Sequence, residues 1–207
     1  SEDKKVYAID GKTGEKKWDF LTGDKVLSSP ALGADGTLFF GSLDKKVYAL
    51  DGRTGKKKWE FETGGKVYTS AAIGKGNLVL IGSADGRLYA LDGKNGEIKW
   101  QSDQKMFSGG INSSAALAFD DTLFVGGMDK KTYALNSRTG KKKWEFATGG
   151  RIGASPTIGS YSASSSGFTG TVYFGSTDDK LYAVDSQTGA KKWEFKTGGN
   201  VEGSCTG

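Results

Sequence analysis

Short apolar stretches alternate with turns rich in glycine and aspartate along the whole chain. Alternating or short apolar stretches between such turns are typical of β-strands. No window shows a 3.6-residue apolar period over ten positions, so a helical repeat is excluded and the pattern predicts an all-β protein. The clearest copy, residues 25–64, predicts four antiparallel strands at 25–32, 37–42, 47–51 and 57–61.

This unit recurs along the chain. The tripeptide Tyr-Ala followed by Ile, Leu or Val occurs five times, and each Ala precedes a Trp by ten residues. Successive Trp residues lie 41, 41, 44 and 49 positions apart. Four strands in a unit of about 40 residues predict one blade of a β-propeller. The five pairs are Ala8 and Trp18, Ala49 and Trp59, Ala90 and Trp100, Ala134 and Trp144, and Ala183 and Trp193.

The repeats divide the single domain, residues 1–207, into blades. Four are complete, at residues 25–64, 65–105, 106–149 and 150–198. Residues 1–24 supply the third and fourth strands of a fifth blade, and residues 199–207 supply its innermost strand. We therefore predict a five-bladed ring closed by the two ends of the chain. The second strand of that blade is missing, so either the chain is a fragment or another molecule completes the blade, for example by donating a strand.

Composition limits the chemistry. Histidine is absent and Cys205 is the only cysteine, which excludes a His-based catalytic triad, a His-ligated zinc site and an internal disulfide. No apolar run approaches the ~18 residues that span a membrane, so we expect no membrane span. No signal peptide precedes Ser1, so if the protein is exported we expect this sequence to be the mature form.

One Asp recurs in the turn between the second and third strands of each blade. A ring of metal ligands is one interpretation, but we favour an Asp that accepts hydrogen bonds from the amides of its own turn. No calcium-binding loop is present, so we predict no metal site. These residues are Asp3, Asp44, Asp85, Asp129 and Asp178.

The chain carries a net charge of +5, and fifteen of its 29 Lys and Arg residues lie between the third strand and the start of the fourth. They could form a positive rim that attracts anionic polymers or lipid headgroups. We favour the alternative, that lysines on an exposed edge strand prevent pairing between molecules. No RNA-binding signature accompanies them, so we predict no specific nucleic-acid partner. They include Lys16, Lys17, Arg53, Lys56, Lys57, Lys58, Arg138, Lys141, Lys142, Lys143, Lys191 and Lys192.

Polar residues align at the start of the innermost strand, which faces the central channel of a propeller. A partly cationic channel mouth is the best candidate site for a carboxylate or a phosphate, with a solvated channel lining as the alternative. Two irregular segments, residues 101–109 and 159–170, could carry function or be flexible connections without one. The aligned residues are Lys25, Lys66, Arg151 and Asn200, with Gly110 in the remaining copy.

The pattern Ala-x-Asp-x-x-Thr-Gly-x-x-x-Trp resembles the tryptophan-docking motif of the PQQ-like (quinoprotein-type) β-propeller repeat family. Three copies are complete, whereas Asn95 replaces Thr in one and Asn136 replaces Asp in another. The resemblance implies that each indole packs between neighbouring blades, on the Ala and on a Gly-containing peptide. We favour this role for the Trp residues over stacking on sugars.

The same resemblance guides the functional prediction. Quinone-dependent dehydrogenases of this family have eight blades, an adjacent cysteine pair, and acidic residues that hold calcium and abstract a proton. This chain has one cysteine and no position that matches the catalytic Asp. The resemblance therefore points to the non-enzymatic, BamB-like branch.

From that branch we predict a non-catalytic scaffold without a cofactor, which binds a protein or an anionic surface polymer. We expect a periplasmic or extracellular location. A lectin-like multivalent carbohydrate binder is the alternative, and a quinone-dependent enzyme has less support.

Overall fold

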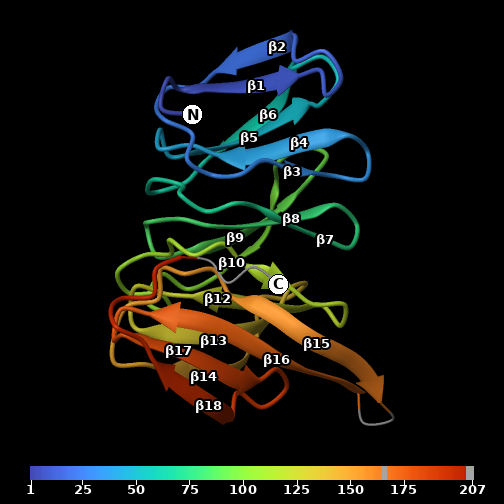
Figure 1. Ribbon diagram of the computed structural model, residues 1–207. Helices are drawn as coiled ribbons and strands as arrows, with labels where there is room; N and C mark the ends of the chain where they lie inside the picture. Colours follow the sequence, from blue (N-terminus) through green and yellow to red (C-terminus); the bar gives the residue numbers. More distant parts are fainter. Residues whose placement is uncertain (165–166, 204–207) are drawn as a thin grey trace.

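The computed structural model describes residues 1–164 and 167–203. In these residues all regular structure is β: one two-stranded sheet and four four-stranded antiparallel sheets follow one another along the chain (Figure 1). None of the described residues forms a helix long and apolar enough to span a membrane. The all-β prediction is confirmed.

The first sheet holds β1 (Lys5–Ile9) and β2 (Lys16–Leu21). The second holds β3 (Ala31–Leu32), β4 (Thr37–Gly41), β5 (Lys46–Asp51) and β6 (Lys57–Glu62). The third holds β7 (Ala72–Gly74), β8 (Leu78–Gly82), β9 (Leu88–Asp92) and β10 (Ile98–Gln101). The fourth holds β11 (Ala116–Leu117), β12 (Thr122–Gly126), β13 (Lys131–Asn136) and β14 (Lys142–Ala147). The last holds β15 (Thr157–Ser164), β16 (Gly167–Ser176), β17 (Lys180–Asp185) and β18 (Lys191–Lys196).

Neighbouring sheets meet at four junctions, and each junction is built around one indole. The N–H of Trp59, on β6, donates to the carbonyl oxygen of Gly93 at 3.0 Å, in the β9–β10 turn of the next sheet. Its ring lies against Gly96, whose φ is +77° and where a Cβ would stand 2.8 Å from the ring. Only glycine adopts this backbone and leaves this space at low cost. Trp18, Trp100 and Trp144 donate in the same way to Gly52, Ser137 and Ser186.

An aromatic pair and an aspartate complete the junction. Phe61 of β6 packs edge-on against Tyr89 of β9, with ring centroids 5.4 Å apart. The Tyr89 hydroxyl and the Gly64 amide both donate to Oδ2 of Asp85, at 2.7 Å each. Burial, and then this bond to Asp85, raises the pKa of Tyr89 to about 12. The aspartate of the turn therefore ties one sheet to the next.

The inner segments, residues 25–30, 66–71, 110–115 and 151–156, differ from the prediction. A full innermost strand was expected at 25–32, but β3 contains two residues. The cause is a side chain: Oγ of Ser28 donates to the carbonyl of Gly41 and accepts from its amide, in place of backbone ladder bonds. The segments are instead joined to one another by hydroxyls, through Ser29 N to Ser70 Oγ, Ser70 N to Ser114 Oγ and Ser114 N to Ser155 Oγ, at 2.8, 2.8 and 3.0 Å.

The predicted closure of the ring is wrong for the described residues. β1 pairs only with β2, and the C-terminal segment is held by its own sheet, with Val201 N donating to Ser176 O at 3.2 Å. The first and last sheets lie at opposite ends of the arc (Figure 1). Since the same packing recurs at every junction, the angle between sheets is set locally, and four such angles do not bring the ends together. Residues 204–207 of the predicted shared blade lie outside the described residues.

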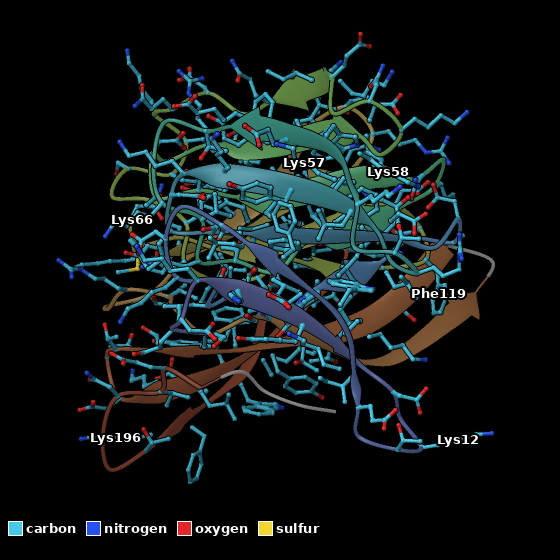
Figure 2. The ribbon with its side chains drawn as sticks, turned by 90° about the horizontal axis from the view of Figure 1, so that it is seen from above. Lys12, Lys57, Lys58, Lys66, Phe119 and Lys196 are labelled. Carbon is cyan, nitrogen blue, oxygen red and sulfur yellow. The ribbon has the colours of Figure 1, made fainter. Side chains whose placement is uncertain are left out.

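Most basic residues at the start of the outer strands form ion pairs. Glu60 of β6 lies 2.6 Å from Nζ of Lys46 on β5 and 2.7 Å from Nζ of Lys57 (Figure 2 labels Lys57). The same triad recurs with Asp19, Glu145 and Glu194 as the acidic members. Exposed pairs of this kind contribute little to stability. Each triad joins two lysines to one carboxylate and keeps one positive charge, so the ion pairs weaken a positive rim without cancelling it.

We expect Gly96→Ala to lower the free energy of unfolding more than Gly36→Ala, the matched control. Both residues have positive φ, +77° and +78°, but nothing lies within 4 Å of a Cβ at Gly36. The left-handed backbone costs each variant about 1–2 kcal/mol. Overpacking against Trp59 costs Gly96→Ala about 1–3 kcal/mol more. Urea unfolding measures both, and equal losses would contradict the packing role of this glycine.

A second prediction concerns pH. Hydrogen bonds from Lys180, and then from Lys191, lower the pKa of Glu194 from 4.5 to about 2. Because the folded pKa is depressed, the ion pairs stabilise the fold above pH 4.5, and this contribution is lost as the pH falls towards 2. We expect Lys180→Gln to raise the pKa of Glu194 towards 4.5 and Lys12→Gln to leave it unchanged. Carbon-detected NMR titration of the carboxyl group reads this out, and an unshifted Glu194 in Lys180→Gln would count against the pair.

Candidate binding site

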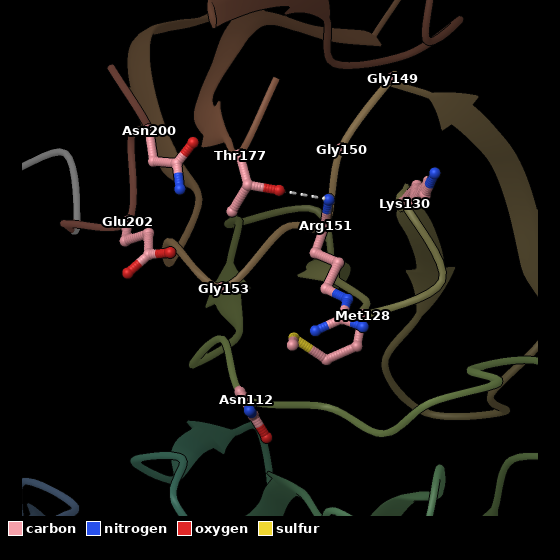
Figure 3. Close-up of a pocket in the computed structure, with 10 residues that line it drawn as sticks. All are labelled: Asn112, Met128, Lys130, Gly149, Gly150, Arg151, Gly153, Thr177, Asn200 and Glu202. Atoms are coloured by element: carbon pink, nitrogen blue, oxygen red, sulfur yellow. Dashed lines mark hydrogen bonds between the residues drawn. The ribbon is translucent and has the colours of Figure 1, made fainter. Parts of the chain in front are cut away.

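A hollow of about 730 Å³ opens between three successive inner segments, near the last two sheets (Figure 3). Its lining is mostly polar. Two cations, Lys130 and Arg151, and one carboxylate, Glu202, face it with Asn112, Thr177 and Asn200. Such a mixture of donors and charge in a concave site suits a small anionic group.

The backbone at Arg151 is fixed from both sides. Its amide donates to Oγ1 of Thr177 at 2.8 Å, and its carbonyl accepts from the amide of Thr177 at 2.9 Å. The next residue, Ile152, is fully buried, and it packs where a Cβ at Gly126 would stand 2.3 Å away. The backbone is thus anchored while the side chain is exposed, and the guanidinium forms no ion pair with any residue of the described ranges.

Asn200 stands on the opposite wall. With its nitrogen turned towards the β16–β17 turn, its amide lies within hydrogen-bond distance of Thr177 O, at 3.0 Å, and of Asp179 Oδ1, at 3.1 Å. It therefore holds the C-terminal segment to the last sheet and leaves its oxygen towards the hollow. Lys130, in the β12–β13 turn with a φ of +71°, is the second cation among the residues that line the hollow.

The structure places the four sequence-predicted residues on one rim but brings only two of them together. Lys25 and Lys66 share the carbonyl bond of Arg151, since their carbonyls accept from Leu43 N and Ala84 N at 2.9 Å each. Neither lines the hollow. Lys25 forms an ion pair with Glu2 at 3.2 Å, and Lys66 projects into solvent (Figure 2).

Lys130, Thr177 and Glu202 were missed by the sequence reasoning. A signal was available for Lys130, which aligns with Lys4 and Lys45 as the left-handed residue of the turn that precedes an inner segment. No sequence signal distinguishes Thr177 or Glu202, because their place in the hollow depends on where the C-terminal segment lies.

A second, mostly apolar hollow of about 560 Å³ lies beside β1. Tyr7, Trp18, Leu32 and Leu38 line it. In the next sheet the second strand, β4, fills the corresponding space, and its Phe39 contacts Trp59 with ring centroids 5.7 Å apart. The first sheet lacks that strand, so one edge of β1 is unpaired in the described residues.

The aspartates of the turns bind protein groups. Oδ1 of Asp3, Asp44 and Asp85 accepts the amide two residues ahead, at 2.9–3.1 Å. In Asp129 and Asp178 the same atom is buried without a partner. Across residues 1–164 and 167–203, no group of three or more Cys, Asp or Glu side chains is arranged to hold a metal ion.

The irregular segment at 101–109 has a packing role. Phe107 is fully buried and packs edge-on against Tyr133 at 4.6 Å, in place of the phenylalanine that the fourth strand supplies at the other junctions. The Tyr133 hydroxyl also donates to Met106 O at 2.7 Å. The segment at 159–170 lengthens the β15–β16 hairpin, and its residues 165–166 lie outside the described residues.

Solved structures similar to this one include BamB from Moraxella catarrhalis, with 23% identity and a TM-score of 0.67 over 94% of this chain and 71% of that chain. A europium-containing methanol dehydrogenase has 17% identity and a TM-score of 0.78, over 93% of this chain and 47% of that chain. The computationally designed protein Ika8 has 17% identity and a TM-score of 0.78, over 98% of this chain and 59% of that chain. The chain thus spans less than two thirds of the last two, and at such identities the likeness shows the fold alone.

No curated protein matches the chain. A family does: the sequence model described as outer membrane protein assembly factor BamB matches residues 2–157. This match covers most of the chain and includes the first three complete repeats. It confirms the resemblance drawn from the docking motif. The chain belongs to the BamB family of β-propeller proteins.

Proposed function

We propose that the protein is a non-catalytic β-propeller scaffold of five blades, the first incomplete, which binds a partner protein through the hollow at Arg151. The observation that supports this most directly is the Arg151 guanidinium, exposed in a hollow of about 730 Å³ without an ion pair in the described residues. Its anchored backbone and the adjacent Lys130 prepare the site for an anionic group.

The expected ligand is one carboxylate of an acidic segment. A guanidinium binds a carboxylate through two parallel hydrogen bonds, which gives geometric selectivity as well as attraction. Glu202, on the opposite wall beside Asn200, repels a densely charged chain but tolerates one anion close to Arg151 (Figure 3). This balance favours a protein side chain over an anionic surface polymer as the partner.

The tryptophans give little support to a lectin. Trp59 and Trp144 are 8% exposed, and the indole N–H groups of Trp18, Trp59, Trp100 and Trp144 are bonded to turn carbonyls. A sugar-stacking platform needs an open ring face. The likeness to a methanol dehydrogenase, at 17% identity, concerns the fold and lends no residue to a quinone mechanism.

A second contact of the scaffold is the free edge of β1. An extended segment of the partner would pair with this edge and place its side chains in the apolar hollow beside Trp18. We place the protein in the periplasm or outside the cell, as the family description, an outer membrane assembly factor, suggests.

The hollow is tested with a fluorescent peptide that carries one glutamate between glycine and serine residues, at low ionic strength. Loss of a charge-assisted hydrogen bond costs about 1.5–3 kcal/mol. We therefore expect Arg151→Gln to weaken binding about ten- to hundredfold by fluorescence anisotropy. Lys66→Gln, which removes the same charge outside the hollow, should change it less than about twofold.

Equal losses in the two variants would show diffuse attraction and overturn the assignment of the hollow. Tighter binding of hyaluronan than of the peptide would make a surface polymer the partner.

The edge of β1 is tested with a soluble peptide that carries residues 37–42, the second strand of the next sheet, flanked by lysines. We expect amide hydrogen exchange to slow within Lys5–Ile9 and not in β5, whose two edges are already paired. A scrambled peptide with a central proline is the control. Unchanged exchange in β1 would contradict strand addition.

A further inference from the structure

The two ends of the arc carry opposite halves of one junction. Within residues 1–164 and 167–203, the last sheet presents a docking tryptophan that no other sheet receives, and the first sheet presents a docking turn that no tryptophan occupies. From this match we propose that a second copy of the chain docks head to tail, so that β15–β18 of one copy packs on β1–β2 of the next.

The first half-contact is the indole and its glycine. Trp193 is 44% exposed, against 8% for Trp59, and its indole N–H donates to no residue in the described part of the chain. In the first sheet, Gly14 has a φ of +75°, close to the +77° of Gly96, and nothing lies within 4 Å of a Cβ built there. Gly14 thus has the conformation of an occupied docking turn without an occupant.

The second half-contact is the aromatic pair. Phe195 is 63% exposed, whereas Phe61, at the same place in its sheet, packs on Tyr89. Tyr7 is 41% exposed, whereas Tyr89 is 5% exposed. Docking would bury Phe195 of one copy against Tyr7 of the next, and apolar burial of this kind is the main driving force of association.

The third half-contact is the aspartate clamp. Asp3 already accepts the Tyr7 hydroxyl on Oδ2, as Asp85 accepts that of Tyr89. Asp85 also accepts the Gly64 amide of the preceding sheet, and the residue that corresponds to Gly64 after β18 is Gly198. Gly198 is uncovered, with nothing within 4 Å of a built Cβ. All three elements of a junction are therefore present, one half at each end.

A second copy satisfies these halves without bending the arc. The two end sheets lie apart, and no hydrogen bond between described residues joins them (Figure 1). To meet within one chain, they would have to change the angle at four packed junctions.

The contact is heterologous, since different surfaces of the two copies meet. Heterologous contacts propagate, and they end in a closed ring or in an open array. Each copy retains a free face in an open dimer. The mass should therefore rise with concentration and not stop at a dimer unless two copies close a ring.

The experiment is light scattering coupled to size-exclusion chromatography on the 207-residue chain over a hundredfold range of concentration. We expect the mass to rise from 21.9 kDa with concentration. Trp193→Ala removes the indole, and Gly14→Asn keeps a residue that tolerates positive φ but fills the place of the ring. Each should weaken association tenfold or more, as hot-spot residues do.

Matched controls separate docking from general effects. Phe119→Ala removes a side chain that is 83% exposed and lies away from both end faces (Figure 2). Gly76→Asn introduces the same side chain at a φ of +73° with open space around it. Both controls should associate like the unchanged chain, and circular dichroism should show the same β-sheet content in all variants.

Mixing the two variants gives the decisive result. Trp193→Ala retains a docking turn, and Gly14→Asn retains a docking tryptophan, so the mixture should form a dimer of twice the chain mass that cannot grow. A constant 21.9 kDa for the unchanged chain would overturn the proposal. So would association that survives both variants, or variants that stay monomeric when mixed, because each places the contact elsewhere.

Discussion

The indole that crosses from one sheet to the next is the contact on which this structure depends. A four-stranded sheet of this size cannot bury both faces alone, and it gains stability only from its neighbours. Trp59 connects three kinds of interaction at one point: ring burial, a hydrogen bond to a turn carbonyl, and close approach to a glycine. The turn must be left-handed at that glycine for the indole to fit. Motif spacing and turn chemistry are thus one constraint.

That constraint explains why the sequence was informative about architecture. The recurring Ala and Trp, with Gly and Asp at the turns, is a local pattern, and local patterns predict strands and sheets well. The all-β fold and the family were predicted for this reason. The innermost strand at 25–32 was not, because a serine hydroxyl competes with the backbone ladder and propensity does not register that competition. Phe107 shows the reverse case, in which an irregular segment restores a regular contact.

Closure and the candidate site depend on the arrangement of whole sheets. The alignment of the chain ends suggested a shared blade, but the angle at each junction is a property of packed side chains and cannot be read from spacing. For the same reason, alignment put Lys25 and Lys66 with Arg151 on one rim without showing which of them share a hollow. Arg151 and Asn200 do, and their role in binding stays a prediction. Glu202 lines the hollow only because the backbone bond from Val201 to Ser176 fixes the C-terminal segment there.

The serine bonds of the inner segments have a consequence for how rigid the molecule is. The apolar layers between sheets open only when a whole sheet separates, so their amides exchange with solvent through large and rare fluctuations. The inner rim is different, since Ser29, Ser70 and Ser114 are held through single hydroxyls that can rotate. Small and frequent openings are therefore confined to the rim. The molecule combines a stiff stack of sheets with a more compliant inner surface, on which the doubly bonded backbone of Arg151 is a fixed point.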